Sequence, residues 1–338
     1  MPKAKSKTSA TRVPELPPRM KAAAVDRFGP PEALTLHELP VPQPDPGEIL
    51  IALSAAGVGV WDADIRAGLW KPPGRARFPV IPGTDGAGFV AAKGPRVRRF
   101  NVGDRVYAYE FGNRKGGFYA EYVCVSAEHA GTVPKSLDLL QAGAAATTGL
   151  TALQGIDNVL RLKAGETVLI FGASGAVGTL AVQFAKRLRA RVVGTASGRK
   201  ATTVVRELGA DVVIDARSTR ATEQLSDFAP DGLDAVLALA GSEALERMLD
   251  NVRTGGRVAY PNGVEPAPRP RGHKLRVSAY DGVASPREFD HLEQAVEESG
   301  LRVPIASVYP LARAAEAHKK LDQGHIVGRL ALRIRRGD

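Results

Sequence analysis

The sequence predicts an α/β protein with two domains, one built of short strands and the other of a doubly wound parallel sheet. Short apolar runs punctuated by Pro and Gly fill the first third of the chain, as is typical of an all-β unit. From Leu137 onward, apolar strand candidates alternate with helical stretches, which favours a parallel sheet covered by helices. A glycine-rich turn joins the first of these strands to a helix.

Length and composition agree with a globular protein of this size. The chain has 338 residues, and at about 100 to 200 residues per domain this length favours two domains. Apolar residues make up 44% of the chain, and no apolar run approaches about 18 residues, so a transmembrane helix is not expected. Cys124 is the one cysteine, so no intramolecular disulfide can form, which suits a reducing compartment and favours a cytoplasmic protein.

The positive charge is unevenly placed. The formal net charge is +10, and residues 1–19 hold one acid, Glu15, against Lys3, Lys5, Lys7, Arg12 and Arg19. We expect a disordered basic tail over residues 1–19 without the apolar segment of a secretory signal, and a short organellar presequence stays open as the alternative. The remaining charge is dispersed and lacks an aromatic-basic motif, so nucleic acid is not an expected partner.

The predicted first domain combines both ends of the chain. Two strand candidates follow the last helical stretch, so we expect the chain to return to the strand-rich domain and assign to it residues 20–135 plus 305–338. Its expected strands include residues 49–53, 88–92, 105–109, 303–308 and 327–334.

The predicted second domain covers residues 136–304. Helical stretches separate most of its apolar runs, which is the pattern of a parallel sheet whose last strand ends near Tyr260. Its expected strands are residues 166–171, 191–195, 211–214, 233–239 and 256–260.

The glycine-rich turn is Gly172-Ala-Ser-Gly175-Ala-Val-Gly178, and we call residues 172–178 the glycine cradle. Glycines there allow a tight turn and a close approach of the backbone to a pyrophosphate, which a helix N-terminus attracts. Such a triplet between a strand and a helix is a strong dinucleotide signal. The expected contacts are Gly172, Ser174, Gly175, Ala176 and Val177.

The end of the second strand indicates which dinucleotide is bound. A free 2′-hydroxyl usually meets an acid there, whereas this chain has Ser197, Arg199 and Lys200, with no acid before Glu207. Two cations and a hydroxyl suit a 2′-phosphate, so we expect NADPH, with Arg329 as a weaker candidate for the same contact. The alternative is that Arg199 and Lys200 only solvate the next helix.

A series of motifs runs in order through the chain after Met20. It includes Gly57-Val-Gly-Val-Trp-Asp62, Phe78-Pro-Val-Ile-Pro-Gly83, Val102-Gly-Asp-Arg-Val106, Gly117-Phe-Tyr-Ala-Glu-Tyr122, the glycine cradle and Leu208-Gly-Ala-Asp211. The series resembles the medium-chain dehydrogenase/reductase superfamily, in its zinc-free quinone oxidoreductase branch. This resemblance implies a GroES-like β-barrel substrate domain, a Rossmann domain that binds NAD(P)H, and a homodimer joined through sheet edges.

The resemblance also implies where the reacting groups lie. It puts Thr151 near the nicotinamide, although a helix cap is the alternative for that residue. The loops that frame the carboxamide would hold Ala240, Asn262 and Gly263. The acceptor is expected between the domains, with ordinary packing as the alternative for each side chain, near Gly59, Trp61, Trp70, Tyr109 and Phe111.

A metal is not expected. Zinc alcohol dehydrogenases of this superfamily place Cys, His and Cys ligands where this chain has Gly59, Thr84 and Thr148. None of the three is a strong zinc ligand, and the six histidines share no metal spacing. Cys124 is expected to be a buried strand residue, and Asp62 with Arg66, at i and i+4, an ion pair.

The nicotinamide is therefore the expected reactive centre. We expect a zinc-independent, NADPH-dependent quinone oxidoreductase that transfers a hydride to a quinone or another conjugated carbonyl, with no catalytic side chain assigned. An enoyl-thioester reductase is disfavoured because Trp70 stands where those enzymes carry a catalytic Tyr. A non-enzymatic NADPH- or RNA-binding protein is the third alternative.

Overall fold

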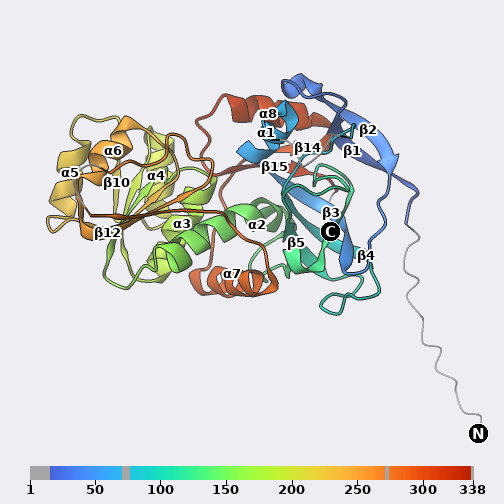
Figure 1. Ribbon diagram of the computed structural model, residues 1–338, viewed down its shortest axis with the longest axis horizontal. Helices are drawn as coiled ribbons and strands as arrows, with labels where there is room; N and C mark the ends of the chain where they lie inside the picture. Colours follow the sequence, from blue (N-terminus) through green and yellow to red (C-terminus); the bar gives the residue numbers. More distant parts are fainter. Residues whose placement is uncertain (1–15, 71–76, 271–273, 336–338) are drawn as a thin grey trace, which may run out of the picture.

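The structure is a computed structural model that describes residues 16–70, 77–270 and 274–335, arranged in two lobes (Figure 1). Most of the expected basic tail, residues 1–15, lies outside the described residues, and β1 (Arg19–Val25) begins where the tail was expected to end. Among the described helices, none is both long enough and apolar enough to cross a membrane.

Both ends of the chain contribute to the first lobe. Its seven-stranded sheet has a path of six strands, β14 (Ile305–Pro310), β15 (Arg329–Arg333), β3 (Glu48–Val58), β4 (Asp85–Lys93), β5 (Arg105–Tyr109) and β7 (Ala130–Thr132). β15 pairs with β3, so segments far apart in the sequence share one sheet, and β6 (Tyr122–Ser126) also pairs with β3.

Smaller elements complete this lobe. β1 pairs antiparallel with β2 (Leu34–Pro40), and two helices, α1 (Val60–Ala67) and α8 (Ala314–Asp322), lie beside them (Figure 1). Apolar side chains from the strands form a buried core that also includes Phe118 and Tyr119. Short helical turns in this lobe occur at Pro31–Ala33, Ala127–His129 and Leu311–Arg313, whereas the turn at Gln154–Val159 packs in the second lobe.

The second lobe is a six-stranded parallel sheet. Its order is β10 (Val212–Ile214), β9 (Arg191–Thr195), β8 (Thr167–Phe171), β11 (Leu233–Ala238), β12 (Val252–Pro261) and β13 (Arg276–Tyr280). The prediction that the sheet ends near Tyr260 is wrong, because β13 pairs with β12 and forms the edge. Four of the five residues of β13 are exposed, so the strand lacks the apolar run that marks the inner strands.

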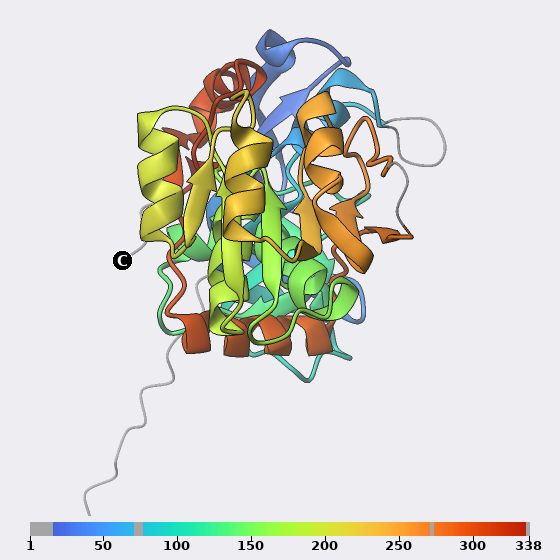
Figure 2. The ribbon, with the colours of Figure 1, turned by 90° about the vertical axis from the view of Figure 1, so that its left-hand side faces the viewer.

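Helices cover both faces of this sheet. Val168 and Ile170 pack in the core that also contains residues of α3 (Ala176–Arg187) and α4 (Arg199–Glu207), whereas Leu169 and Phe171 point to the opposite face. α5 (Ala221–Phe228) and α6 (Glu243–Leu249) pack on that opposite face. Figure 2 shows α5 and α6 in front of the strands. α2 (Leu139–Leu153) and α7 (Pro286–Ser299) pack with α3.

The strand order contains one topological switch point. From β8 the chain moves outward through β9 and β10, then returns to the other side of β8 with β11. Connections that leave in opposite directions open a crevice at the carboxyl ends of β8 and β11, where sheets of this kind bind ligands. The predicted α/β fold class, with its parallel sheet and strand-rich first domain, is confirmed.

Candidate active site

A cavity of about 900 Å³ opens at this crevice, between the two lobes. We call it the inter-lobe cavity. The glycine cradle and the turns after β11 and β12 line one side, and residues from α1, β5, α2 and β15 line the other. Of the predicted site residues, it brings together Gly59, Trp61, Tyr109, Phe111, Thr151, Gly172, Gly175, Ala176, Val177, Ala240, Asn262, Gly263 and Arg329.

The glycine cradle follows β8 and opens α3, as the sequence predicts. Gly172 has φ +89°, and its N–H donates to Thr195 Oγ1 at 2.8 Å, which fixes the turn against β9. A Cβ on Gly178 would lie 2.2 Å from the carbonyl oxygen of Gly172, so the helix can approach the turn only without a side chain there. The resulting bare backbone at a helix N-terminus fits a pyrophosphate.

The segment before β15 crosses this cradle. The N–H of Gly328 donates to the carbonyl oxygen of Ser174 at 2.9 Å, which joins the lobes directly at the turn. Gly328 has φ +83°, and a Cβ there would lie 2.1 Å from the carbonyl oxygen of Pro304. Only glycine fits at residue 328, because a side chain there would collide with the Pro304 carbonyl and displace the segment from the cradle.

A second cavity, of about 240 Å³, adjoins the first at Gly172, which lines both. Ser174 and Ser197 line this smaller cavity, and their contact with the cofactor stays a prediction. Ala216 also lines it and contributes no polar side chain. Arg199 and Lys200 begin α4 as exposed residues and are not among those that line either cavity.

An acid that the sequence did not predict, Asp215, lies beside Ser197. Asp215, just after β10, accepts a hydrogen bond from Ser197 Oγ at 2.7 Å and pairs with Arg217 at 3.3 Å. Hydrogen bonds from Arg217 and Ser197 lower the pKa of Asp215 to about 2, so it is ionised at neutral pH. The acid that binds a free 2′-hydroxyl is expected at the end of β9, whereas Asp215 follows the neighbouring strand β10 and lies 18 residues after Ser197 in the sequence.

Arg329 does not lie at the smaller cavity, so the geometry does not support its predicted contact with a 2′-phosphate. It lines the inter-lobe cavity and pairs with Asp85 Oδ1 at 2.6 Å, with both side chains buried. Asp85 also accepts a hydrogen bond from the backbone N–H of Thr147 at 2.9 Å. A Cβ on Gly57 would lie 2.5 Å from Arg329 Nη2 and from Asp85 Oδ1, so a glycine is needed beside this ion pair.

Three of the predicted aromatic residues, Trp61, Trp70 and Phe111, pack together, but they do not all line the cavity. Trp61 and Phe111 line it with ring centroids 5.4 Å apart. Trp70 packs on Phe111 at 4.3 Å and is not a lining residue, so it supports the pocket from behind. Burial raises the pKa of Tyr109, also a lining residue, to about 12, which keeps its phenol protonated at neutral pH.

Thr151 lies in the last turn of α2, with its hydroxyl donating to the carbonyl oxygen of Thr147 at 2.8 Å. Asp138 caps the N-terminus of this helix, so the helix-cap interpretation of Thr151 is wrong. Tyr280 donates from its hydroxyl to the carbonyl oxygen of Thr151 at 2.8 Å, which holds the end of α2 against β13. The role of Thr151 toward a nicotinamide stays a prediction.

The predicted ion pair between Asp62 and Arg66 is wrong. Arg66 pairs instead with Asp322 at 3.4 Å and donates to His318 Nδ1 at 3.1 Å. An arginine can only donate, so the proton of His318 lies on Nε2 and points to Tyr119 Oη at 3.0 Å. Tyr119 in turn donates to Asp62 Oδ2 at 3.2 Å. Sequence spacing does not predict this hydrogen-bonded network, because its members come from three distant segments of the sequence.

Asp62 is fully buried beneath the cavity and is not among the residues that line it. Burial raises the pKa of Asp62 to about 7, and the nearby charge of Asp85 adds to this rise. The charge of Arg329 and hydrogen bonds from Gly59 and Thr84 oppose it. Burial, with a smaller contribution from Arg66, lowers the pKa of His318 to about 3, so the imidazole is neutral at physiological pH.

The residues present do not fit a zinc ion. Gly59, Thr84 and Thr148 line the inter-lobe cavity, but glycine has no side-chain donor and the Thr148 hydroxyl donates to the carbonyl oxygen of Ala144 at 3.0 Å. Over residues 16–70, 77–270 and 274–335, no group of three His, Cys, Asp or Glu side chains could hold a metal. Cys124 is buried in β6, as predicted, and burial raises the pKa of its thiol to about 12.

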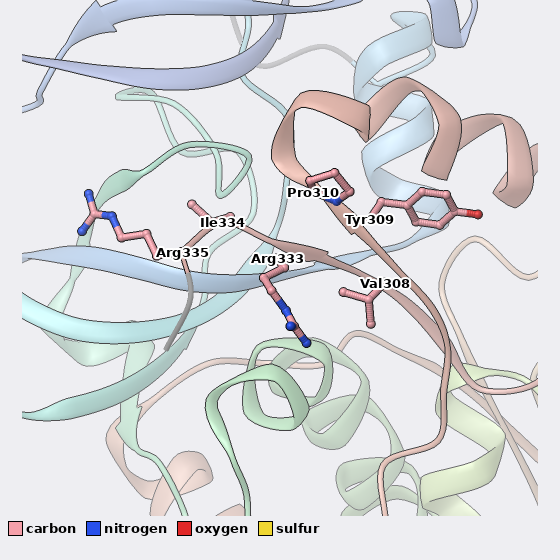
Figure 3. A pocket seen from close by; sticks show the side chains of 6 residues that line it. All are labelled: Val308, Tyr309, Pro310, Arg333, Ile334 and Arg335. Carbon is pink, nitrogen blue, oxygen red and sulfur yellow. The ribbon is translucent and has the colours of Figure 1, made fainter. Parts of the chain in front are cut away.

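A separate depression of about 470 Å³ lies on the first lobe, away from these residues. Figure 3 shows that Arg333 and Arg335 point in different directions there, so the cations do not converge on a ligand. The lining residues are Val308, Tyr309, Pro310, Arg333, Ile334 and Arg335. We assign it no role.

Comparison with known proteins agrees with this architecture. Residues 45–135 match the alcohol dehydrogenase GroES-like domain, and residues 208–332 match a family described as zinc-binding dehydrogenase. The quinone oxidoreductase of Lama guanicoe is 33% identical over 313 residues, which cover 89% of this chain and 93% of that protein.

Two solved structures show the same fold. An NAD-dependent alcohol dehydrogenase superposes with a TM-score of 0.86 at 29% identity, covering 94% of this chain and 100% of that one. A mycobacterial protein in complex with NADPH gives 0.80 at 28% identity, covering 93% of this chain and 100% of that one. Because fold, motif order and overall identity agree, this chain belongs to the quinone oxidoreductase family of the medium-chain dehydrogenase/reductase superfamily.

Proposed function

We propose that the protein is an NADPH-dependent reductase of quinones or other conjugated carbonyls that works without a metal. The observation that carries this proposal is the pair of cavities that adjoin at Gly172, one with Ser197 and the other reaching across to the aromatic residues of the first lobe. A dinucleotide laid over the glycine cradle would have one half in each cavity.

Residues of the chain can be assigned to each part of the cofactor. The bare backbone of the glycine cradle would hold the pyrophosphate, and Ser197 would meet the adenosine ribose with Arg199, Lys200 and Arg217 at the open rim. In the inter-lobe cavity, Thr151 and the turns at Ala240 and 262–263 would orient the nicotinamide. The bound dihydronicotinamide would supply a hydride, so that NADPH, acceptor and one proton from water yield NADP⁺ and the reduced acceptor.

The first lobe would bind the acceptor. Trp61, Tyr109 and Phe111 present flat apolar surface in the cavity, which suits a conjugated ring and excludes water from the reacting atoms. Trp61 also reaches the second lobe, because a Cβ on Gly263 would lie 3.1 Å from its ring. Acceptor and nicotinamide would therefore lie against the same side of the cavity. Holding them close together would be the main contribution of the protein to the rate of hydride transfer.

Turnover with a panel of acceptors tests this function. We expect oxidation of NADPH with quinones and enones, and slower oxidation with an enoyl thioester. Trp70, which packs on Phe111, stands where enoyl-thioester reductases carry a catalytic Tyr, and an indole cannot donate a proton as a phenol can. Oxidation only with the thioester would support the enoyl-thioester alternative. Binding of NADPH without turnover of any acceptor would support a non-enzymatic role.

A pair of tryptophan variants tests the placement of the acceptor. Trp61→Leu removes a lining ring and should raise the KM for an aromatic quinone about tenfold, since truncating a buried aromatic contact costs about 1 to 2 kcal/mol. Trp70→Phe is the matched control, because Trp70 packs on Phe111 outside the cavity lining. Equal effects of both changes would contradict the assignment.

We also propose that the protein is a homodimer joined through β13. This strand ends the parallel sheet, and Val277 on it is an exposed apolar side chain. Pairing two such edges would satisfy their free backbone groups. Light scattering at micromolar concentration should give twice the chain mass, and a monomer would refute the proposal.

A further inference from the structure

The charge of the inter-lobe cavity is opposite to that of the whole chain. The chain has a formal net charge of +10. Among the described residues that line the cavity, the charged ones are three acids, Asp64, Glu265 and Asp281, and one cation, Arg329. A basic protein therefore presents an acidic lining at the place proposed here for the acceptor.

The three acids are not neutralised by neighbouring cations. Arg329 is already paired with the buried carboxylate of Asp85 at 2.6 Å, so its charge is compensated. Within residues 16–70, 77–270 and 274–335, none of the three acids forms an ion pair. Asp281 Oδ2 accepts a hydrogen bond at 2.8 Å, but its donor is the neutral side-chain amide of Asn262. Three uncompensated negative charges therefore remain on the lining.

Asp64 and Trp61 lie on one face of α1. They are three residues apart in the helix, a spacing that brings side chains to the same side, and both line the cavity. Burial raises the pKa of Asp64, and the charge of Arg66 opposes this rise. The carboxylate of Asp64 therefore borders the ring proposed to contact the acceptor.

Asp281 belongs to a segment that is held where the nicotinamide would lie. Gln154 accepts from the N–H of Val283 at 3.0 Å and donates to the carbonyl oxygen of Val283 at 2.8 Å. A Cβ on Gly282 would lie 2.6 Å from Thr151 Oγ1, so the segment packs closely against the end of α2. These contacts fix the backbone that carries Asp281 at the edge of the cavity.

The remaining acid, Glu265, lies on the same lobe as Asp281. It follows Gly263 by two residues, and a Cβ on Gly263 would lie 3.1 Å from the ring of Trp61. Burial is the main cause of the raised pKa of Tyr109, and the charge of Asp281 adds to it, so this carboxylate is within electrostatic reach of that phenol. The three acids thus come from three separate segments that surround the aromatic lining.

We propose that Asp64, Glu265 and Asp281 determine the charge of the acceptor, because together they exclude anionic conjugated carbonyls and leave neutral or cationic ones as substrates. This inference rests on the proposed function and names its substrate class. An anionic group in the cavity would lose water and meet like charges, whereas a neutral ring packs on Trp61 and Phe111. The phosphates of the cofactor would lie apart from these acids, at the glycine cradle. Thioesters on a phosphate-bearing carrier belong to the excluded class.

Two probes of the same shape test the charge without any turnover. Naphthalenesulfonamide is neutral, and naphthalenesulfonate is its anionic analogue. One unit charge at about 7 Å from another changes a dissociation constant about threefold in a water-like dielectric, so three acids amount to about twentyfold at low ionic strength. Calorimetry on the NADPH-saturated protein at about pH 8 should show the neutral probe bound more tightly by about this factor or more, and added salt should reduce the difference.

Variants are needed because an apolar cavity alone also favours a neutral probe. Asp64→Asn, Glu265→Gln and Asp281→Asn should each reduce the preference about threefold, and the triple variant should lose the part that depends on salt. Glu207→Gln is the matched control, because this exposed acid at the end of α4 lines neither cavity. It should leave the preference unchanged.

Two results would overturn the inference. One is equal binding of the two probes by the wild type, and the other is a preference that the three charge-removing variants change no more than Glu207→Gln does. If Asp64→Asn does not fold, Glu265→Gln and Asp281→Asn decide, because both of these side chains are exposed. Failure of the proposed function would show differently, as absence of quinone turnover by a wild type that still discriminates between the probes.

Discussion

Replacing Asp215 by Asn should strengthen the preference for NADPH over NADH. The Asp215 carboxylate lies 2.7 Å from the hydroxyl of Ser197, which lines the cavity proposed for the adenosine half. Its lowered pKa, about 2, keeps it charged under assay conditions. It would therefore repel a 2′-phosphate and accept a hydrogen bond from a free 2′-hydroxyl.

The size of the effect follows from charge and exposure. A phosphate with about −1.5 charges at about 5 Å from a carboxylate is disfavoured by about 1 kcal/mol in a water-like dielectric. The Asp215 side chain is 39% exposed, so this water-like value applies. Losing the acceptor for a 2′-hydroxyl weakens NADH by about 1 kcal/mol more. The ratio of the two dissociation constants should thus shift about thirtyfold toward NADPH.

Fluorescence titration with each cofactor measures this ratio. Arg217, released from Asp215, should add to the gain for NADPH, and the gain should shrink at high salt because the site is open to solvent. Asp211→Asn is the control, because Asp211 is similarly exposed and ion-paired, with Lys186, but lies at the opposite end of β10. A ratio that does not change, or that moves toward NADH, would refute the assignment of the smaller cavity.

The remaining predictions concern the cradle, the buried acid and metal content. Gly178→Ala should weaken NADPH binding and lower the melting temperature, because its Cβ would lie 2.2 Å from the carbonyl oxygen of Gly172. Gly175→Ala, whose nearest contact is 3.4 Å, should change NADPH binding only. Equal melting temperatures of the two variants would contradict this prediction. Folding raises the pKa of Asp62 from its ordinary value of 3.8 to about 7. The folded state therefore loses stability as the pH rises from about 4 to 7, and the loss amounts to at most about 4 kcal/mol. Denaturant unfolding should therefore show that the stability of Asp62→Asn rises relative to that of the wild type between about pH 4 and 8. Single-turnover hydride transfer should be largely retained in this variant. A stability difference that does not change with pH would argue against a protonated Asp62. Elemental analysis should find no stoichiometric zinc and chelators should leave turnover unchanged, whereas one zinc per chain would refute the reasoning from Gly59, Thr84 and Thr148.

The sequence by itself determines the fold class and the cofactor cradle. Strand and helix periodicity are local properties, and the glycines at 172, 175 and 178 act within a single strand-turn-helix unit. The replacement of metal-binding residue types is likewise readable without coordinates, because a glycine or an engaged threonine lacks the donor wherever it lies. Ser197 lines the smaller cavity, and Trp61 and Tyr109 line the inter-lobe cavity, whereas their contacts with cofactor and acceptor stay predictions.

Only the tertiary structure decides which charges meet. Asp62 and Arg66 have the spacing of an ion pair, yet each finds its partner in another segment, Tyr119 for Asp62 and Asp322 for Arg66. Arg329, placed by sequence near the 2′-phosphate, lies on β15 and pairs with Asp85 on β4, and these two strands flank β3. Asp215 reaches Ser197 from the neighbouring parallel strand. Charge pairing depends on distances between segments that are remote in sequence, and these are set by sheet order and burial, not by local periodicity.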